Sequence, residues 1–204
     1  MKILCFGASS TYGAGDPLGG WTARLRANLD AEVPANQVNK TLLYNLGISS
    51  QTTQDLRERF EQEAKPRCKS KADTTIILHI GGNDASFIPS KDAFRVPVDQ
   101  FAQNMDWLIA LAKTYADKVL VLTLTPVIDS VTIDQGAHDR SKSNAHNEQY
   151  NAKLLDICTE HQVTLINTWS AFMEADHQRL ICDDGIHPNG DGHQLIFELV
   201  KPHL

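Results

Sequence analysis

Five short apolar runs along the chain have the pattern of buried β-strands. They begin near residues 2, 41, 74, 118 and 163 and read KILCFG, TLLYNLG, TTIILHIGG, KVLVLTLTP and VTLINT. Apolar residues follow one another in these runs instead of alternating with polar ones, which is typical of strands covered on both faces of a parallel sheet. The pattern therefore predicts five strands in one sheet.

The segments between the runs repeat apolar side chains every three or four residues, which is the spacing of one helix face. The clearest stripe contains Phe101, Met105, Leu108, Ala112 and Tyr115. Similar stripes span 21–29, 56–64, 150–158 and 195–200, and we expect Pro66 and Pro202 to end two of them. Strands that alternate with helices predict an α/β fold, a three-layer α/β/α sandwich with a five-stranded parallel sheet and right-handed crossovers.

Length, charge and cysteine content narrow the class of protein. The 204 residues predict a single domain spanning residues 1–204, and the net charge of 19 − 25 = −6 argues against sequence-independent binding of nucleic acid. No apolar stretch reaches the roughly 20 residues of a membrane span. The four apolar residues before Gly7 are fewer than the ~7–15 of a signal peptide, and the four cysteines form no CxxC pair. We therefore expect a cytoplasmic protein with reduced thiols and no membrane span.

Residues that could take part in catalysis follow the ends of the predicted strands. Ser9 comes directly after the first run, Gly47 closes the second, Asn83 follows the third, and Asp184 and His187 lie beyond the fifth. Because parallel strands emerge at the same edge of a sheet, we expect these five residues to gather there. A serine supplies a nucleophile, and a histidine with an ordinary pKa of about 6.5 supplies its base. A carboxylate can orient the imidazole, and backbone and amide N–H groups can stabilise an oxyanion.

Several other sites fit this sequence less well. A phosphate-binding loop is disfavoured because no lysine follows Gly13 and because Leu18 stands where a dinucleotide fingerprint has its third glycine. An α/β-hydrolase elbow would need a glycine at Thr11. Ser10 and Asp183 are neighbouring alternatives to Ser9 and Asp184. A metal site is the remaining alternative, because five acidic or imidazole side chains fall within eleven residues: Asp183, Asp184, His187, Asp191 and His193.

The four blocks GASSTYG, NLG, GGND and DGIH resemble those of the SGNH-hydrolase superfamily, the GDSL-type esterases and lipases. The resemblance spans nearly the whole chain. It implies a flavodoxin-like sheet of strand order 2-1-3-4-5 and no cofactor. It also implies Ser9 as nucleophile, Gly47 and Asn83 as oxyanion donors, and His187 as base with Asp184 behind it. One departure is visible, since Ala8 stands where most members have the Asp of GDSL.

The resemblance implies an ester-hydrolysing enzyme that forms an acyl-enzyme from a small-molecule ester. Members of the family act on lysophospholipids, thioesters, simple short esters and acetylated sugars. Two polar segments after the third and fourth strands, residues 86–97 and 129–147, are expected to wall the pocket and favour small or polar esters. A non-catalytic ligand-binding domain and an acyltransferase are the alternatives. Among other polar residues, we expect His79 to be packed in the core, Asp84 to be structural and Asp191 to begin the last helix.

Overall fold

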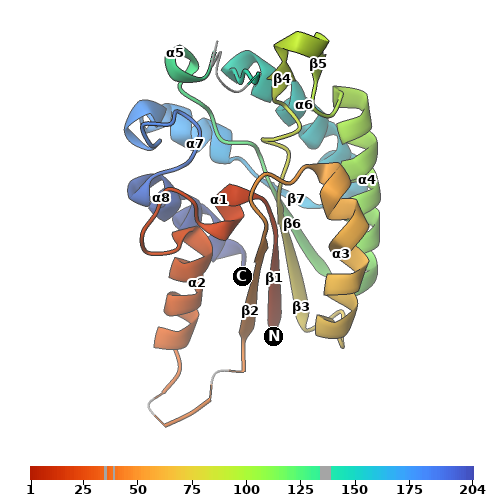
Figure 1. The fold of residues 1–204 in the computed structure, drawn as a ribbon. Coiled ribbons are helices and arrows are strands. Elements are labelled where there is room, and N and C mark those ends of the chain that lie inside the picture. Colours follow the sequence, from red (N-terminus) through yellow and green to blue (C-terminus); the bar gives the residue numbers. More distant parts are fainter. Residues whose placement is uncertain (35, 39, 134–138) are drawn as a thin grey trace.

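Five parallel strands form the centre of the computed structural model, which describes residues 1–34, 36–38, 40–133 and 139–204 (Figure 1). Their order in the sheet is β2-β1-β3-β6-β7, which is 2-1-3-4-5 when the five predicted strands are numbered along the chain. The strands are β1 (Lys2–Gly7), β2 (Leu42–Gly47), β3 (Thr74–His79), β6 (Lys118–Leu122) and β7 (Thr164–Ile166). The structure confirms the predicted parallel sheet and its order.

Helices cover both faces of this sheet (Figure 1). One face carries α3 (Thr53–Arg67), α4 (Val98–Tyr115) and α6 (Asn144–His161). The other carries α2 (Gly20–Ala31), α7 (Thr168–Glu174) and α8 (Gly190–Val200). The short elements are α1 (Ser9–Tyr12), α5 (Asp129–Thr132) and the antiparallel hairpin of β4 (Phe87–Ile88) and β5 (Ala93–Phe94). The three-layer α/β/α sandwich predicted from the sequence is confirmed.

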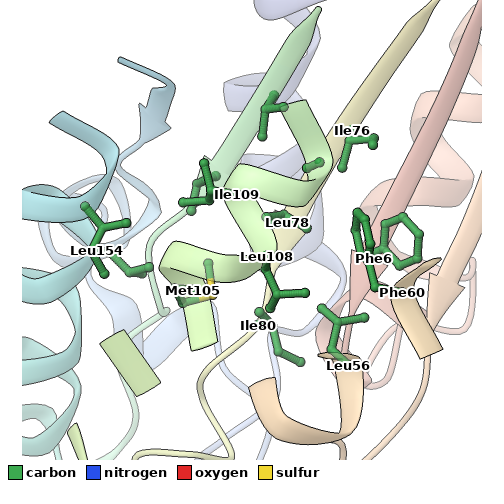
Figure 2. Close-up of a cluster of buried hydrophobic side chains, with 14 of the residues drawn as sticks. Phe6, Leu56, Phe60, Ile76, Leu78, Ile80, Met105, Leu108, Ile109 and Leu154 are labelled. Atoms are coloured by element: carbon green, nitrogen blue, oxygen red, sulfur yellow. The ribbon is translucent and has the colours of Figure 1, made fainter. Parts of the chain in front are cut away.

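Side chains of β1 alternate between two apolar cores. Leu4 and Phe6 pack toward α3 and α4, whereas Ile3 and Cys5 pack toward α2 and α8, and all four are fully buried. Figure 2 shows the first core, where the rings of Phe6 and Phe60 lie 4.5 Å apart between centroids. Burial on both faces accounts for the uninterrupted apolar run, because neither face of the strand meets water.

The structure corrects the predicted end of one helix and adds short elements. Helix α3 continues through Pro66 to Arg67, one residue beyond the predicted stop, because Cys68 N–H donates to Ala64 O at 2.9 Å and closes the last turn. The β4–β5 hairpin and α7 were not predicted, since each is too short to show a periodic apolar pattern. Asn167, whose side chain accepts from Ser170 N–H, is the local signal for the start of α7.

Other expectations about single residues agree with the structure. His79 is buried at the end of β3. Asp191 lies in the first turn of α8, which begins after Asn189 caps it. None of the helices in the described ranges is long and apolar enough to cross a membrane.

Candidate active site

The turn after β1 places Ser9 at the first residue of α1. Close packing at this turn requires two glycines. A Cβ on Gly7 would lie 2.3 Å from His79 O, and a Cβ on Gly47 would lie 2.3 Å from Tyr12 N. These two residues are also direct partners in the register of β1 and β2. The absence of their side chains therefore allows α1 to sit directly over the strand ends.

Asp184 and His187 form a compact turn before α8. Asp184 Oδ1 accepts from the backbone N–H groups of Ile186 (2.9 Å) and His187 (3.0 Å), and Oδ2 lies 2.6 Å from His187 Nδ1. Partial burial raises the pKa of Asp184, but these hydrogen bonds outweigh it and lower the pKa overall. Because the ionised carboxylate only accepts, Nδ1 carries the imidazole proton and Nε2 keeps a free lone pair.

The lone pair of His187 faces the hydroxyl of Ser9. The distance from Nε2 to Ser9 Oγ is 2.9 Å, which is hydrogen-bond distance between residues 178 positions apart in the chain. Asp183, the neighbouring acid, is exposed, and it is Asp184 that contacts the imidazole. The structure thus brings together Ser9, His187 and Asp184 in one line of hydrogen bonds.

Asn83 lies beside Ser9 in the loop after β3, and both residues line the same two cavities. Its Nδ2 donates to Gln51 O at 2.9 Å, which leaves the second amide proton for another acceptor. The next residue, Asp84, is fully buried and accepts from Thr53 N–H at 3.0 Å, and it also bonds the Thr53 hydroxyl. Burial raises the pKa of Asp84 to about 6 despite these bonds. Asp84 therefore ties the loop that carries Asn83 to the start of α3.

Gly47 has a different environment from the other predicted site residues. Its backbone N–H donates to Asn45 Oδ1 at 3.0 Å, and Gly47 is absent from the described lining of both cavities. An oxyanion could use this N–H only after the Asn45 side chain turned away. The predicted donor role of Gly47 stays a prediction.

Two cavities meet at Ser9 and Asn83. The smaller has a volume of about 50 Å³, with apolar walls at Ile80, Leu124 and Val127 and polar side chains that include Lys142 and Asn147. The larger has a volume of about 290 Å³. Its lining consists of Ser9, Ala14, Ser49, Ser50, Asn83, Thr132, Arg140, Lys142, Ile186 and His187.

The two polar segments predicted to wall the pocket contribute differently. Residues 129–147 supply Thr132, Arg140 and Lys142 to the larger cavity, and residues 134–138 of that segment lie outside the described residues. Residues 86–97 form the β4–β5 hairpin and supply no side chain to the described lining of either cavity.

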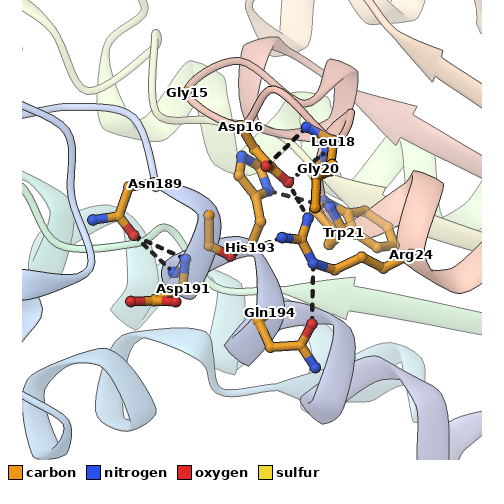
Figure 3. Close-up of polar contacts among 12 residues, drawn as sticks. Gly15, Asp16, Leu18, Gly20, Trp21, Arg24, Asn189, Asp191, His193 and Gln194 are labelled. Atoms are coloured by element: carbon orange, nitrogen blue, oxygen red, sulfur yellow. Dashed lines mark hydrogen bonds and ion pairs between the residues drawn. The ribbon is translucent and has the colours of Figure 1, made fainter.

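A buried polar cluster holds the segment between α1 and α2 against the His187 turn (Figure 3). Asp16 accepts from Leu18 and Gly20 N–H, both at 3.0 Å, and pairs with Arg24. Arg24 in turn donates to Gly190 O at 3.1 Å and Gln194 Oε1 at 3.0 Å. The sequence analysis missed the Asp16–Arg24 pair, because the eight-residue separation across a turn has no characteristic pattern.

His193 belongs to the same cluster and bears on the metal alternative. Its Nδ1 accepts from Trp21 N–H at 3.2 Å, and its Nε2 donates to Ala14 O at 2.9 Å. Both ring nitrogens are thus engaged with backbone groups and unavailable to a metal ion. Among the residues that the structure describes, no group of three or more His, Cys, Asp or Glu side chains is arranged to hold one.

Comparison with a family model identifies the chain. The model of the GDSL-like Lipase/Acylhydrolase family matches residues 5–195, which is most of the chain. The chain belongs to this family. Membership makes it an ester-hydrolysing enzyme, as the resemblance of its four blocks predicted, and a catalytic triad and an oxyanion hole are expected of the family.

Named relatives of this GDSL-like chain cover nearly its full length. A Bacillus subtilis (strain 168) protein described as "Uncharacterized lipoprotein YqeF" is 26% identical over 227 residues, which cover 98% of this chain and 87% of that protein. The lipase/acylhydrolase from Enterococcus faecalis has a similar fold, with a TM-score of 0.77, 20% identity and coverage of 99% and 94% of the two chains. For Axe2, an acetylxylan esterase from Geobacillus stearothermophilus, the TM-score is 0.73, the identity 22% and the coverage 98% and 92%.

Proposed function

We propose that this GDSL-family enzyme is a serine esterase that hydrolyses small or polar carboxylic esters through an acyl-enzyme. The observation that carries the proposal is the line of contacts from Ser9 Oγ to His187 Nε2 (2.9 Å) and from His187 Nδ1 to Asp184 Oδ2 (2.6 Å). A serine hydroxyl is a weak nucleophile until a base removes its proton, and this geometry supplies the base and fixes its tautomer.

The proposed reaction has two halves. His187 Nε2 takes the proton of Ser9 as Oγ attacks the carbonyl carbon, and the imidazolium then gives that proton to the departing alcohol. Water, deprotonated by His187, attacks the acyl-enzyme and releases the carboxylic acid and free Ser9. The free amide proton of Asn83 and the Ser9 N–H at the start of α1 stabilise the tetrahedral oxyanion in each half.

The smaller cavity supports a short acyl group. A cavity of about 50 Å³ is small compared with the neighbouring one of about 290 Å³, so it favours a short acyl group such as acetyl over a long chain. Its apolar walls suit the methyl end of such a group. Axe2, which has a similar fold, is an acetylxylan esterase, and this supports acetyl esters as the first small esters to test.

A covalent probe and a simple ester test the proposal together. We expect the enzyme to hydrolyse p-nitrophenyl acetate and to gain one fluorophosphonate adduct that peptide mass spectrometry maps to Ser9. Ser9→Ala should lower kcat by about 10⁴–10⁶ and abolish the adduct, because one member of a cooperating triad is lost.

Ser10→Ala is the matched control, since Ser10 is the neighbouring hydroxyl and should retain the adduct. Loss of the adduct in Ser10→Ala but not in Ser9→Ala would transfer the nucleophile to Ser10. A ligand-binding domain would show neither turnover nor adduct. An acyltransferase would give an acylated acceptor as its main product when an alcohol is added.

A further inference from the structure

The larger cavity is positively charged although the chain carries a net charge of −6. Arg140 lines only this cavity, Lys142 lines both cavities where they meet, and no Asp or Glu is among the described lining residues of the larger one. The remaining polar walls are neutral hydroxyl and amide groups and His187. Clefts lined by one sign of charge concentrate oppositely charged ligands, so this cavity favours an anion.

Backbone pairing fixes where these two cations point. Ser141 forms an antiparallel bridge with Phe87, in which each residue donates its N–H to the carbonyl oxygen of the other at 2.9 Å. In extended backbone, residues on either side of one position project to the same face. Arg140 and Lys142 therefore share a face, the one that both contribute to the cavity. The β4–β5 hairpin thus serves the site indirectly, by holding Ser141.

Lys142 is a buried cation, and the Asp84 carboxylate raises its pKa without forming an ion pair with it. It is 8% exposed, its backbone is anchored to Thr132, and its Nζ donates to Gly82 O. Among the described residues, no carboxylate lies within ion-pair distance of Lys142 or Arg140. Burial lowers the pKa of Lys142 to about 8, so the ammonium stays largely protonated at neutral pH. A buried charge is costly unless it is paired, and two of its three donor protons have no partner in the described structure.

The position of His187 decides which part of the substrate meets these cations. His187 lines the larger cavity, whereas the described lining of the smaller cavity does not include it. Under the proposed mechanism the imidazolium must reach the oxygen of the leaving alcohol. The alcohol part therefore lies in the larger cavity, and the short acyl group lies in the smaller one.

We propose that the leaving alcohol of the natural ester carries an anionic group, a carboxylate or a phosphate, bound by Lys142 and Arg140. This inference rests on the proposed serine esterase function and names its substrate class. Arg140 offers a planar fork of donors, and Lys142 offers a compact charge beside the reacting atoms. The reaction is then the deacylation of a short acyl ester of a hydroxy acid or of a phosphorylated alcohol.

Three acetate esters of matched length test the inference: butyl acetate, 4-acetoxybutanoate and 3-acetoxypropyl phosphate. We expect kcat/KM for at least one anionic ester to exceed that for butyl acetate by tenfold or more, and to fall as NaCl concentration rises. The preferred anion distinguishes carboxylate from phosphate recognition. Equal kcat/KM for all three esters would overturn the inference.

Substitutions of the two cations test whether they bind the anionic group. Arg140→Gln and Lys142→Met should each lower the ratio of anionic to neutral kcat/KM by about tenfold, the loss expected for one charge-assisted hydrogen bond. Lys65→Gln is the control, because it removes a positive charge from the exposed side of α3 far from the cavities and should leave the ratio unchanged. Arg140 is exposed, so its variant is expected to fold even if Lys142→Met does not.

The outcomes separate this inference from the function on which it depends. If Lys142 only supports the Gly82 loop, Lys142→Met lowers kcat/KM equally for neutral and anionic esters. If Arg140→Gln also leaves the ratio of anionic to neutral kcat/KM unchanged, anion recognition by this cavity is overturned. Absence of turnover with every ester, together with absence of a fluorophosphonate adduct, overturns the esterase proposal itself.

Discussion

His187 and Asn83, beside Ser9, each have a partner that restricts the motion of the side chain before any substrate binds. Asp184 holds the ring of His187 through Nδ1, and Gln51 O holds the amide of Asn83. Such fixed groups cost no reorganisation when charge develops on the carbonyl oxygen of the substrate. Individual substitutions here should therefore affect the transition state more than substrate binding.

Asn83→Ala tests this expectation. Loss of its amide should lower kcat by about 10²–10³, or roughly 2.7–4 kcal/mol of transition-state stabilisation, with a smaller change in KM. Steady-state kinetics with p-nitrophenyl acetate measure both constants. Asn167→Ala is the control, because Asn167 is an exposed amide at the start of α7 that lines neither of the two cavities. A decrease below tenfold in Asn83→Ala would remove Asn83 from the oxyanion site.

Residues near one another in sequence carried most of the successful inference at this scale. Asp184 and His187 are three positions apart, and one turn of the chain brings their side chains into contact. The role of Lys142 could not be predicted in this way. It depends on contacts with Phe87, Gly82 and the cavity, which only the folded chain brings together. The oxyanion roles of Gly47 and Asn83 stay predictions.

Among the elements, α2 and α8 are joined by hydrogen bonds from Arg24, whose guanidinium is held by an ion pair with Asp16. Asp16 precedes α2, Arg24 lies within it, and Arg24 reaches Gly190 and Gln194 at the start of α8. Gly15, with φ +93°, lies so close to the His187 turn that a Cβ there would be 2.2 Å from Pro188 O. The loop before α2 and the loop before α8 therefore pack as one unit.

Asp16→Asn should destabilise the protein by about 2 kcal/mol at pH 7, because it leaves Arg24 without its buried partner. Burial raises the pKa of Asp16, but the bonds from Arg24, Leu18 and Gly20 outweigh it and lower the pKa overall. The stabilisation from Asp16 is thus complete above the unfolded-state pKa of about 3.9 and disappears as pH falls through the lower folded-state value.

Urea unfolding of wild type and Asp16→Asn between pH 7 and pH 3 measures this difference. Asp30→Asn removes a carboxylate from an exposed i,i+4 pair with Arg26 and should change the free energy of unfolding by less than about 0.5 kcal/mol. Equal effects of the two substitutions would contradict a special role for the Asp16–Arg24 pair.

At the scale of the whole molecule, the five parallel strands were predictable from the apolar pattern, their order came from the family resemblance, and the accessory elements were not predicted. Apolar runs and helical stripes reflect burial, and burial is the largest influence on which residues occupy the strands. The β4–β5 hairpin has two-residue strands, so its pairing with Ser141 contributes almost no periodic pattern. The single domain and the cytoplasmic location stay predictions.

Because the core covers both faces of the sheet, alanine substitutions of two leucines on neighbouring helices should change the free energy of unfolding very differently. Leu108→Ala should lower the free energy of unfolding by about 2–5 kcal/mol, because Leu108 is fully buried between α4 and the sheet (Figure 2). Leu155→Ala on α6 should change it by about 0.5 kcal/mol or less, because Leu155 is 57% exposed. Chemical denaturation of both variants gives the comparison, and similar losses would argue against the packing described for α4.

The contact between Ser9 and His187 joins the turn after β1 to the loop before α8, 178 positions later. During synthesis the hydroxyl leaves the ribosome early, but its proton acceptor emerges only when the final helix is about to form. Under the proposed mechanism an incomplete polypeptide therefore holds an inert serine until the loop of His187 has docked beside it.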